Sequence, residues 1–251
     1  MTAITLLTDF GTADYFAGAM KGVILSINPQ AVIADVTHEI PAQDVAAGAF
    51  TLLAAYDTFP EGTIHVAVVD PGVGSARRPI VVSAGGNLFV GPDNGLFTHV
   101  YDSQPSFQAF HITASQYFRQ PVSTTFHGRD VFAPVAAVLS TGVEASSLGP
   151  RISDPVRLSI PVTPTIIHID RFGNLITNIT RDGLPARASL LVNGKLITAF
   201  RSFFGEGGGD EPFGIWGSAG FLEIAVNGGS AAEYLDVKRG DQVDIQPPKD
   251  T

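Results

Sequence analysis

An acidic residue followed by two arginines stands at the end of an apolar stretch in residues 68–79, VVDPGVGSARRP. Asp70 comes directly after the apolar residues, and Arg77 and Arg78 follow a glycine-containing turn. A guanidinium beside a carboxylate favours its ionised form, and a charged carboxylate can orient a water molecule or accept its proton. The alternative is a solvated turn with scattered charge, because Pro-Gly after an aspartate is also typical of a β-turn.

Two more groups of ionisable residues lie near the ends of predicted strands and helices. Asp9 and Asp14 follow the first apolar run, and His127 and Arg129 stand in TTFHGRD, residues 124–130, just before a helical pattern. Singly, each has a structural explanation, since an aspartate before a helix is commonly an N-cap and a lone histidine is commonly a hydrogen-bonded, partly buried residue. Ligands of parallel α/β sheets collect at the carboxyl ends of strands. Three such groups together therefore favour a reaction centre.

The elements that must position these groups alternate between strand and helix. Apolar runs and helical spacing predict strands at 3–10, 31–37 and 62–70 and helices at 15–29, 42–60 and 128–142. Residues 80–97 predict two short strands joined by a Gly-Gly-Asn hairpin. Continuous apolar strands alternating with helices indicate a largely parallel sheet covered on both faces.

The chain changes character after this region. Residues 149–164 contain four prolines and no helical period, which is typical of a linker, and the following residues read as short strands, with Asn193-Gly194 predicting a type I′ hairpin. We therefore predict an α/β domain at 1–155, a proline-rich linker at 156–164 and a smaller all-β, antiparallel domain at 165–251.

The composition excludes several classes of function. The 251 residues include 24 acidic and 15 basic side chains, a net charge of −9, so a nucleic-acid partner is not expected. The chain has no cysteine, which excludes disulfides, thiolate metal sites and a cysteine nucleophile. Its apolar runs are strand-sized and its first residues lack a basic leader, so we expect a cytoplasmic protein without a membrane partner.

Five motifs cover nearly the whole chain in this order: LLTDFG, VVDPGVGSARRP, FHGRD, DRFGNLITNI and GSAGFLEIAVNGG. In order and spacing they resemble the S-adenosylmethionine hydroxide adenosyltransferase family, the relatives of fluorinase. The resemblance implies an enzyme that uses water or hydroxide to displace methionine from the ribose C5′ of S-adenosylmethionine, giving adenosine and L-methionine. It implies no cofactor and no metal, since the sulfur departs as a neutral thioether. It also implies a homotrimer with sites at subunit interfaces.

The same resemblance assigns roles to individual residues. Asp70, Arg77 and His127 would handle the attacking water, with Arg77 keeping Asp70 charged and His127 acting as a second acceptor. Asp9 would accept hydrogen bonds from the ribose hydroxyls. The other substrate contacts would come from Asp170 and Asn174 (methionine amino and carboxyl groups), Ser218 (methionine carboxylate), Asn227 and Gly228 (adenine edge) and Phe172 (packing on the ligand).

Differences from the halogenating relatives favour water as the nucleophile. Fluorinase has tyrosine where this chain has Asp70, and Tyr-Ser where it has His127-Gly128, so the halogenating site lacks these ionisable groups. The fluorinase arginine after the serine is Ala219 here, so the carboxylate clamp must differ, and a substrate-contacting tryptophan is replaced by Ile176. The extra loop of fluorinase is missing as well, because only Gly-Gly-Asn at 85–87 joins the two strands.

Two other functions are weighed against this one. A metal-dependent nucleoside or nucleotide hydrolase would use a carboxylate-rich cation site, for which the chain offers Asp9, Asp14, Asp70, His127 and Asp130. Its DPG sequence resembles the calcium motif of nucleoside hydrolases, but Val73 and Gly74 stand where that motif needs a further aspartate pair. A nucleoside-binding module without turnover is the second alternative, and assaying adenosine release distinguishes it.

Overall fold

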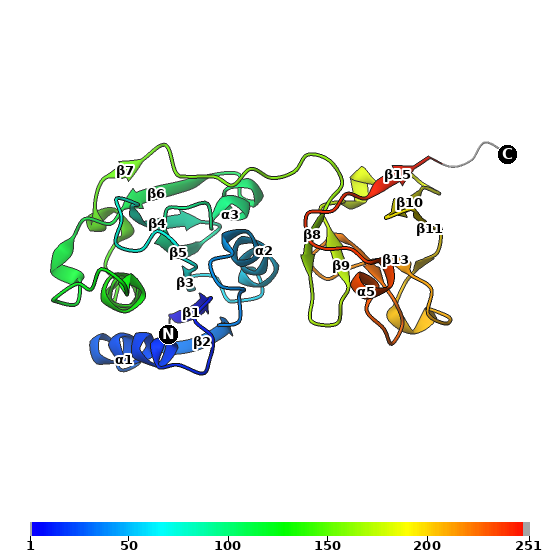
Figure 1. Cartoon of the computed structure of the whole chain (residues 1–251). Coiled ribbons are helices and arrows are strands. Elements are labelled where there is room, and N and C mark those ends of the chain that lie inside the picture. Colours follow the sequence, from blue (N-terminus) through cyan, green and yellow to red (C-terminus); the bar gives the residue numbers. More distant parts are fainter. Residues whose placement is uncertain (1, 248–251) are drawn as a thin grey trace. The chain divides into compact units, whose positions relative to one another are not determined.

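The computed structural model describes residues 2–247, and its chain divides into two compact units, Met1–Leu158 and Ser159–Thr251 (Figure 1). Among the described residues, no helix has the length and apolar character needed to cross a bilayer. Each unit has its own apolar core and is described separately.

The first unit is built on a seven-stranded sheet in the order β2-β1-β3-β5-β4-β6-β7. Its strands are β1 (Ala3–Thr8), β2 (Val32–Thr37), β3 (Ile64–Val68), β4 (Pro79–Ala84), β5 (Asn87–Pro92), β6 (Phe107–His111) and β7 (Arg151–Ile152). Strands β2, β1, β3 and β5 are parallel, whereas β4 is antiparallel to β5 and β6, and β7 is antiparallel to β6. The sheet is therefore mixed, and the prediction of a largely parallel sheet is wrong for its second half.

A tight turn explains the antiparallel half of the sheet. Gly85 and Gly86 both have positive φ angles, 54° and 75°, and reverse the chain between β4 and β5, as the Gly-Gly-Asn signal predicted. A two-residue turn leaves no room for a crossover helix, so neighbouring strands must run in opposite directions.

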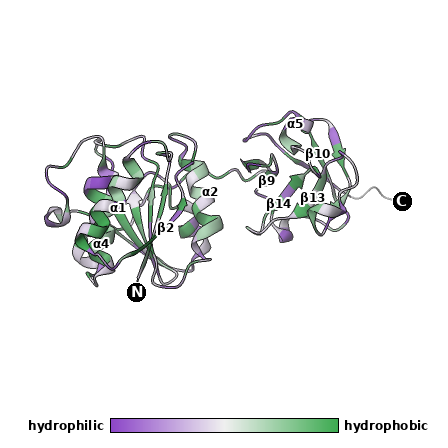
Figure 2. Cartoon of the chain, turned by 90° about the horizontal axis from the view of Figure 1, so that it is seen from below, coloured by the Kyte–Doolittle hydropathy of each residue, from purple (hydrophilic) through white to green (hydrophobic). Residues whose placement is uncertain are grey.

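Helices cover both faces of this sheet (Figure 2). Helices α1 (Phe16–Ile27) and α4 (Ala133–Ser140) share one apolar cluster, and α2 (Val45–Tyr56) and α3 (Thr98–Ser103) share the other. In β3, Val66 and Val68 belong to the first cluster and Ala67 to the second, because successive side chains of a strand point to opposite faces. Short helical turns complete the unit: η1 (Ser115–Tyr117), η2 (Gly128–Phe132) and η3 (Ala145–Leu148).

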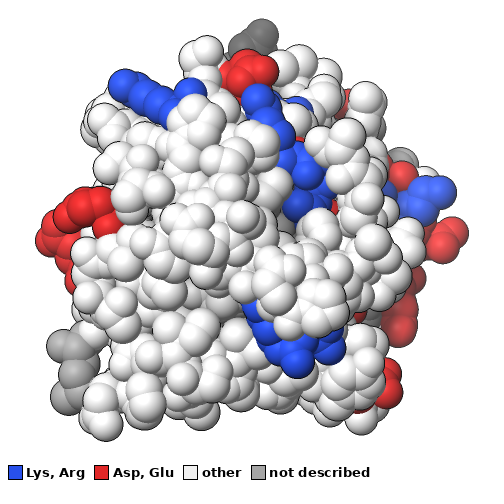
Figure 3. Space-filling view, turned by 90° about the vertical axis from the view of Figure 1, so that its left-hand side faces the viewer, with Lys and Arg blue, Asp and Glu red and all other residues white. Residues whose placement is uncertain are grey.

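One face of the molecule is sparsely charged. Figure 3 shows a face on which basic side chains form separate patches among uncharged atoms. That distribution agrees with a chain in which only 16% of residues are charged.

Up to residue 247, the second unit consists of short strands, one short α-helix and two short 3-10 helices. A five-stranded sheet has the order β12-β13-β14-β9-β8 and a three-stranded sheet the order β11-β10-β15. All pairs are antiparallel except β12 with β13. The elements are β8 (Ile166–Ile169), β9 (Leu175–Thr177), η4 (Arg181–Gly183), β10 (Ser189–Val192), β11 (Lys195–Ile197), β12 (Phe200–Arg201), η5 (Phe204–Glu206), β13 (Phe213–Trp216), β14 (Leu222–Ala225), α5 (Ala231–Leu235) and β15 (Asp244–Gln246).

The hairpin predicted at Asn193-Gly194 is confirmed. It joins β10 to β11, and both residues have positive φ angles, 45° and 75°, as a type I′ turn requires.

Candidate active site

Asp70 stands two residues beyond the end of β3, at the sheet edge where β1 also ends. Strands β1 and β3 are parallel and Thr8 pairs with Val68, so Asp9 and Asp70 leave the sheet at the same edge. The chain then turns through Gly74, whose φ is +77° and whose missing Cβ would lie 2.3 Å from the carbonyl oxygen of Thr124. Only glycine fits this turn, which returns the chain toward the carboxylate.

The returning chain places Arg77 on Asp70. The Arg77 Nε–H donates to both carboxylate oxygens at 2.9 and 3.0 Å, and Nη2 donates to Oδ2. Both side chains are largely buried, with exposed fractions of 9% for Arg77 and 5% for Asp70. The guanidinium carbon lies 5.1 Å from the centre of the Phe132 ring. Because the pair is shielded from solvent, its attraction is screened less than that of a surface pair.

Arg77 also contacts His127, the residue before the helical turn η2. Nη2 lies 2.8 Å from Nδ1 of the imidazole. Burial lowers the pKa of His127, and the positive charge of Arg77 lowers it further, so the neutral ring is favoured. Since an arginine only donates, Nδ1 must accept and the proton of the neutral ring must sit on Nε2. His127 therefore presents a donor at Nε2, which differs from the second acceptor expected from the sequence.

Arg78 has different partners from its neighbour. Its Nε donates to Asp93 at 2.8 Å, and its two terminal nitrogens contact the side chain and carbonyl oxygen of Asp154. The Asp93 side chain is 2% exposed, so Arg78 neutralises a buried carboxylate rather than standing as a free surface charge. Of the two arginines, Arg77 is the one that faces Asp70.

Asp130 supports the segment that carries His127. Its side chain is fully buried and accepts hydrogen bonds from Arg129 at 2.7 and 2.8 Å, from Arg119 at 3.3 Å and from the Ser123 backbone at 2.9 Å. Burial acts to raise the pKa of Asp130, but these donors outweigh it and the pKa is lowered. Asp130 is thus a charged anchor for the loop at 123–127.

Asp9 and Asp14, the other acids considered for a metal site, do not form a metal-binding cluster. Asp9 is half-buried and accepts a hydrogen bond from the backbone of Gln43 at 2.8 Å, whereas Asp14 is exposed. Across residues 2–247, no three histidine or acidic side chains gather as metal ligands would.

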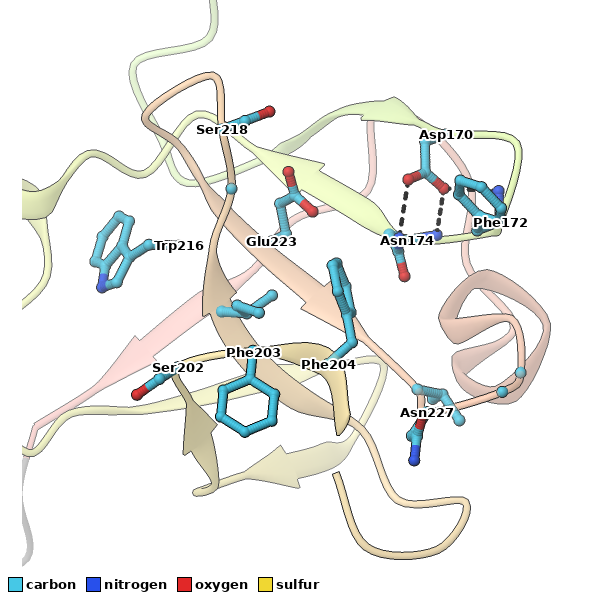
Figure 4. A pocket seen from close by; sticks show the side chains of 15 residues that line it. Asp170, Phe172, Asn174, Ser202, Phe203, Phe204, Trp216, Ser218, Glu223 and Asn227 are labelled. Atoms are coloured by element: carbon cyan, nitrogen blue, oxygen red, sulfur yellow. Dashed lines mark hydrogen bonds between the residues drawn. The ribbon is translucent and has the colours of Figure 1, made fainter. Parts of the chain in front are cut away.

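The second unit holds a pocket of about 900 Å³ (Figure 4). It collects every residue that the sequence assigned to substrate in this half of the chain: Asp170, Phe172, Asn174, Ser218, Asn227 and Gly228. These residues come from the turn after β8, the β13–β14 turn and the turn after β14, so the fold brings distant segments to one place.

The turn after β8 is closed by its own aspartate. Oδ1 of Asp170 accepts from the backbone of Phe172 at 2.8 Å and of Asn174 at 2.9 Å, and Oδ2 accepts from the Asn174 side chain at 2.8 Å (Figure 4). These bonds fix the direction of the largely buried Asn174 amide. They leave the Phe172 ring 76% exposed at the pocket.

Sequence reasoning missed several lining residues. Phe203 and Phe204 are 59% and 46% exposed and line the pocket together with Ser202 and Glu223. Two adjacent phenylalanines beside a glycine run, and a single acid inside the apolar run LEIA, were the available signals. Exposed aromatic faces offer stacking surfaces to a planar ligand.

Glu223 is the second acid of this pocket. It lies on β14 between the buried Leu222 and Ile224 and is itself half-buried. Burial raises the pKa of Glu223, and the negative charge of Asp170 raises it further.

The two parts of the chain match the two domain models of one protein family. The model of the SAM hydroxide adenosyltransferase N-terminal domain matches residues 4–149, and that of the C-terminal domain matches residues 164–244. This chain belongs to the SAM hydroxide adenosyltransferase family. The resemblance drawn from the five motifs is therefore confirmed.

Individual members of the family and its relatives align over nearly the full chain. An (R)-S-adenosyl-L-methionine hydrolase from Thermus thermophilus is 39% identical over 253 residues, covering 96% of this chain and 98% of that protein. A fluorinase from an Actinoplanes species is 27% identical over 282 residues, with 94% and 95% covered. The crystal structure of a conserved protein from Thermotoga maritima matches with a TM-score of 0.91 at 35% identity, covering 97% of this chain and all of that one.

In this family member, the residue after His127 has little room for a side chain. A Cβ on Gly128 would lie 3.2 to 3.3 Å from Met20, Phe126 and Phe10. A serine there, as in fluorinase, would require these neighbours to move. The contrast at positions 127–128 is therefore a difference in packing as well as in ionisable groups.

Proposed function

We propose that this protein is a SAM hydrolase, which converts S-adenosyl-L-methionine to adenosine and L-methionine by attack of water on the ribose C5′. The observation that supports this most is the Arg77 bridge, which joins a carboxylate and a neutral imidazole in a family whose members include (R)-S-adenosyl-L-methionine hydrolases. The pocket of the second unit adds exposed aromatic surfaces and polar groups suited to the substrate.

The proposed reaction is a single displacement. A lone pair of the water oxygen forms the bond to C5′ while the C5′–S bond breaks, and its electron pair stays on sulfur as the neutral thioether of methionine. The proton lost by the water passes to Asp70 and then to solvent. Because the sulfonium leaves as a neutral group, the reaction needs no general acid, metal or cofactor. Catalysis therefore depends on the nucleophile and its alignment.

Each residue of the bridged cluster has a defined part in this reaction. Asp70 accepts a hydrogen bond from the water, and Nε2–H of His127 donates one to its oxygen, leaving a lone pair for C5′. Arg77 holds the Asp70 carboxylate in place and fixes the tautomer of His127 by donating to Nδ1. Asp9 accepts hydrogen bonds from the ribose hydroxyls.

The second unit supplies the remaining contacts of the proposed complex. The purine stacks on the exposed ring of Phe203, the ring of Phe172 packs on the ligand, and the turn at Asn227 and Gly228 meets the purine edge. Ser218, exposed on the β13–β14 turn, hydrogen-bonds the methionine carboxylate. The turn closed by Asp170 and Asn174 lies beside the methionine half.

We also propose that the enzyme is a cytoplasmic homotrimer whose sites form at subunit interfaces. Mixing two inactive variants tests this assembly, one altered at Asp70 and the other at Asn174. If each site combines residues of two subunits, the refolded mixture regains part of the activity. A mixture as inactive as its components, or a monomer in light scattering, argues against shared sites.

The activity itself is tested by chromatography of the reaction mixture. Wild-type protein is expected to release adenosine and methionine from S-adenosylmethionine in equal amounts. Asp70→Asn keeps the size of the side chain and removes its charge, so kcat is expected to fall by about 100-fold or more while KM changes little. A fall in affinity with unchanged turnover would contradict the role assigned to Asp70. Absence of adenosine with the wild-type protein would refute the proposed function.

A further inference from the structure

A buried histidine, His38, joins the end of β2 to the turn that carries Asp9. The residue is 4% exposed, and its Nδ1 lies 2.8 Å from the hydroxyl oxygen of Thr8, the last residue of β1. The same hydroxyl oxygen accepts a hydrogen bond from the backbone of Phe10 at 3.2 Å. Because Asp9 lies between Thr8 and Phe10, these contacts limit how its backbone, and therefore its carboxylate, can turn.

An irregularity between β1 and β2 brings His38 to this position. The register of the two strands shifts by one residue between Leu6 and Leu7, so that Leu7 pairs with Thr37. The next position along the strands therefore places His38 beside Thr8, where a regular ladder would have placed Thr37. Such an extra residue in a strand re-aims the side chains that follow it and is common next to active sites.

The other nitrogen of the His38 ring faces an acid. Nε2 lies 3.1 Å from Oδ1 of Asp35, whose Oδ2 accepts from Nζ of Lys21 at 2.6 Å. Burial acts to raise the pKa of Asp35, but Lys21 and His38 outweigh it and the pKa is lowered. Because a carboxylate only accepts, the proton of the neutral ring belongs on Nε2, and Nδ1 accepts from the Thr8 hydroxyl. Asp35 thus fixes the direction in which the Thr8 hydroxyl points.

The loop after β2 also holds the Asp9 turn through its backbone. The Gln43 N–H donates to Oδ2 of Asp9 at 2.8 Å, and the Gly11 N–H donates to the carbonyl oxygen of His38 at 2.7 Å. Gln43 has a φ of +65°, in the left-handed region that favours glycine. Backbone strain of this kind persists only where the surroundings hold it, and it collects at functional sites. The turn at 8–11 is therefore fixed by a side chain and by a strained loop together.

From these contacts we propose that His38, oriented by Asp35, is a positioning residue that aims the Asp9 carboxylate at the ribose hydroxyls of the substrate. This role rests on the proposed SAM hydrolase function, in which Asp9 accepts from those hydroxyls. His38 acts through Thr8 and does not itself contact the substrate. Gln43 engages Oδ2 of Asp9, so Oδ1 retains its capacity for the ligand.

A second threonine–histidine pair on the same strand provides a matched control. Oγ1 of Thr5 lies 2.8 Å from Nδ1 of His65, and both residues are buried. This pair lies three residues before the end of β1, and burial alone lowers the pKa of His65 to about 4. Thr5→Val and Thr8→Val each leave a buried histidine nitrogen without its hydroxyl, so they should lower Tm by comparable amounts. Only Thr8→Val should loosen the turn that carries Asp9.

The first measurement compares S-adenosylmethionine with its 2′,3′-dideoxy analogue, which keeps the sulfonium and C5′ but lacks both ribose hydroxyls. For wild-type protein, the analogue is expected to have a KM about 10- to 100-fold higher, as for hydrogen bonds to a charged acceptor. Thr8→Val and His38→Leu should lower this ratio about 5-fold, the effect of one hydrogen bond, by raising KM for the natural substrate alone. Thr5→Val should keep the wild-type ratio. His38→Asn, whose amide oxygen can accept from the Thr8 hydroxyl, should restore most of it.

The second measurement is amide hydrogen exchange read by mass spectrometry, which needs no turnover. Thr8→Val and His38→Leu should speed exchange in the peptide that covers residues 9–12, because the acceptor of the Phe10 N–H is lost or displaced. Thr5→Val should leave exchange in that peptide at the wild-type rate. The comparison therefore separates a loosened turn from a general loss of stability.

Several results would overturn this role of His38. One is a Thr8→Val enzyme that keeps the wild-type preference for the ribose hydroxyls. Another is an equal loss of that preference in Thr5→Val and Thr8→Val, which would report destabilisation alone. Unchanged exchange at 9–12 in both Thr8→Val and His38→Leu would overturn it whether or not the enzyme is active. If wild-type protein hydrolyses neither substrate, the proposed function fails instead, while the exchange rates still decide whether His38 holds the turn.

Discussion

Replacing Gly74 with alanine tests whether the turn after β3 sets the geometry of the site. The residue has a φ of +77°, and an added Cβ would lie 2.3 Å from the carbonyl oxygen of Thr124. An L-residue in the left-handed region costs about 1–2 kcal/mol. Overpacking against backbone adds about 1–3 kcal/mol, because a carbonyl cannot rotate away as a side chain can. We expect a loss of about 2–5 kcal/mol in the free energy of unfolding.

Gly62→Ala is the matched control for this substitution. Gly62 also has a positive φ, +86°, but no atom lies within 4 Å of its missing Cβ, so only the backbone cost of about 1–2 kcal/mol applies. For a domain of this size, 1 kcal/mol lowers Tm by about 2–4 °C. Thermal unfolding should therefore show a decrease of about 2–8 °C for Gly62→Ala and about 4–20 °C for Gly74→Ala.

The two variants should differ more in activity than in stability. Thr124 stands three residues before His127, so moving its carbonyl displaces the imidazole that lies 2.8 Å from Arg77. A displacement of about 1 Å can lower turnover by about 100-fold. Measured well below the unfolding transition, kcat/KM should fall strongly for Gly74→Ala and stay near wild type for Gly62→Ala. Equal Tm decreases together with unchanged kcat/KM in both variants would refute this reasoning.

Three other measurements follow from the same contacts. Arg77→Lys removes the guanidinium that contacts both Asp70 and His127, so kcat should fall at least about 10-fold. Arg78→Lys weakens the contact with the buried Asp93 and should lower Tm more than kcat. A larger loss of kcat in Arg78→Lys than in Arg77→Lys would exchange the two roles. Prolonged dialysis against EDTA should leave the activity intact, because the departing sulfur needs no Lewis acid; a loss that Ca²⁺ or Mg²⁺ restores would favour the metal-dependent hydrolase. As pH falls through 6.5, kcat should hold, since burial and Arg77 lower the pKa of His127 and keep its ring neutral. A fall in kcat at that pH would contradict the neutral ring.

The sequence predicted the parts of the fold that short-range patterns determine. Apolar runs and helical spacing gave the helices and strands next to Asp9, Asp70 and His127, and a Gly-Gly and an Asn-Gly pair gave the two hairpins. The antiparallel half of the first sheet was underestimated, because a hairpin signal between two strands does not reveal how later strands join them. Strand β6 pairs with β4 rather than continuing the parallel series.

Candidate residues were easier to find than their roles. The ionisable groups at strand ends stood out in sequence, but the tautomer of His127 depends on which nitrogen meets Arg77, and that requires coordinates. Glu223 and the exposed rings of Phe203 and Phe204 were missed because one acid in an apolar strand and two adjacent phenylalanines are typical of ordinary packing. Their common pocket becomes visible only in the folded chain.

The fate of the water oxygen tests the proposed reaction most directly. Hydrolysis of S-adenosylmethionine in water enriched in ¹⁸O should give adenosine whose 5′-hydroxyl carries the label, together with unlabelled L-methionine, as read by mass spectrometry. Labelled homoserine with methylthioadenosine would place the attack on the methionine chain. That product pair, or adenosine without the label, would contradict a water molecule held by Asp70 and His127 and directed at C5′.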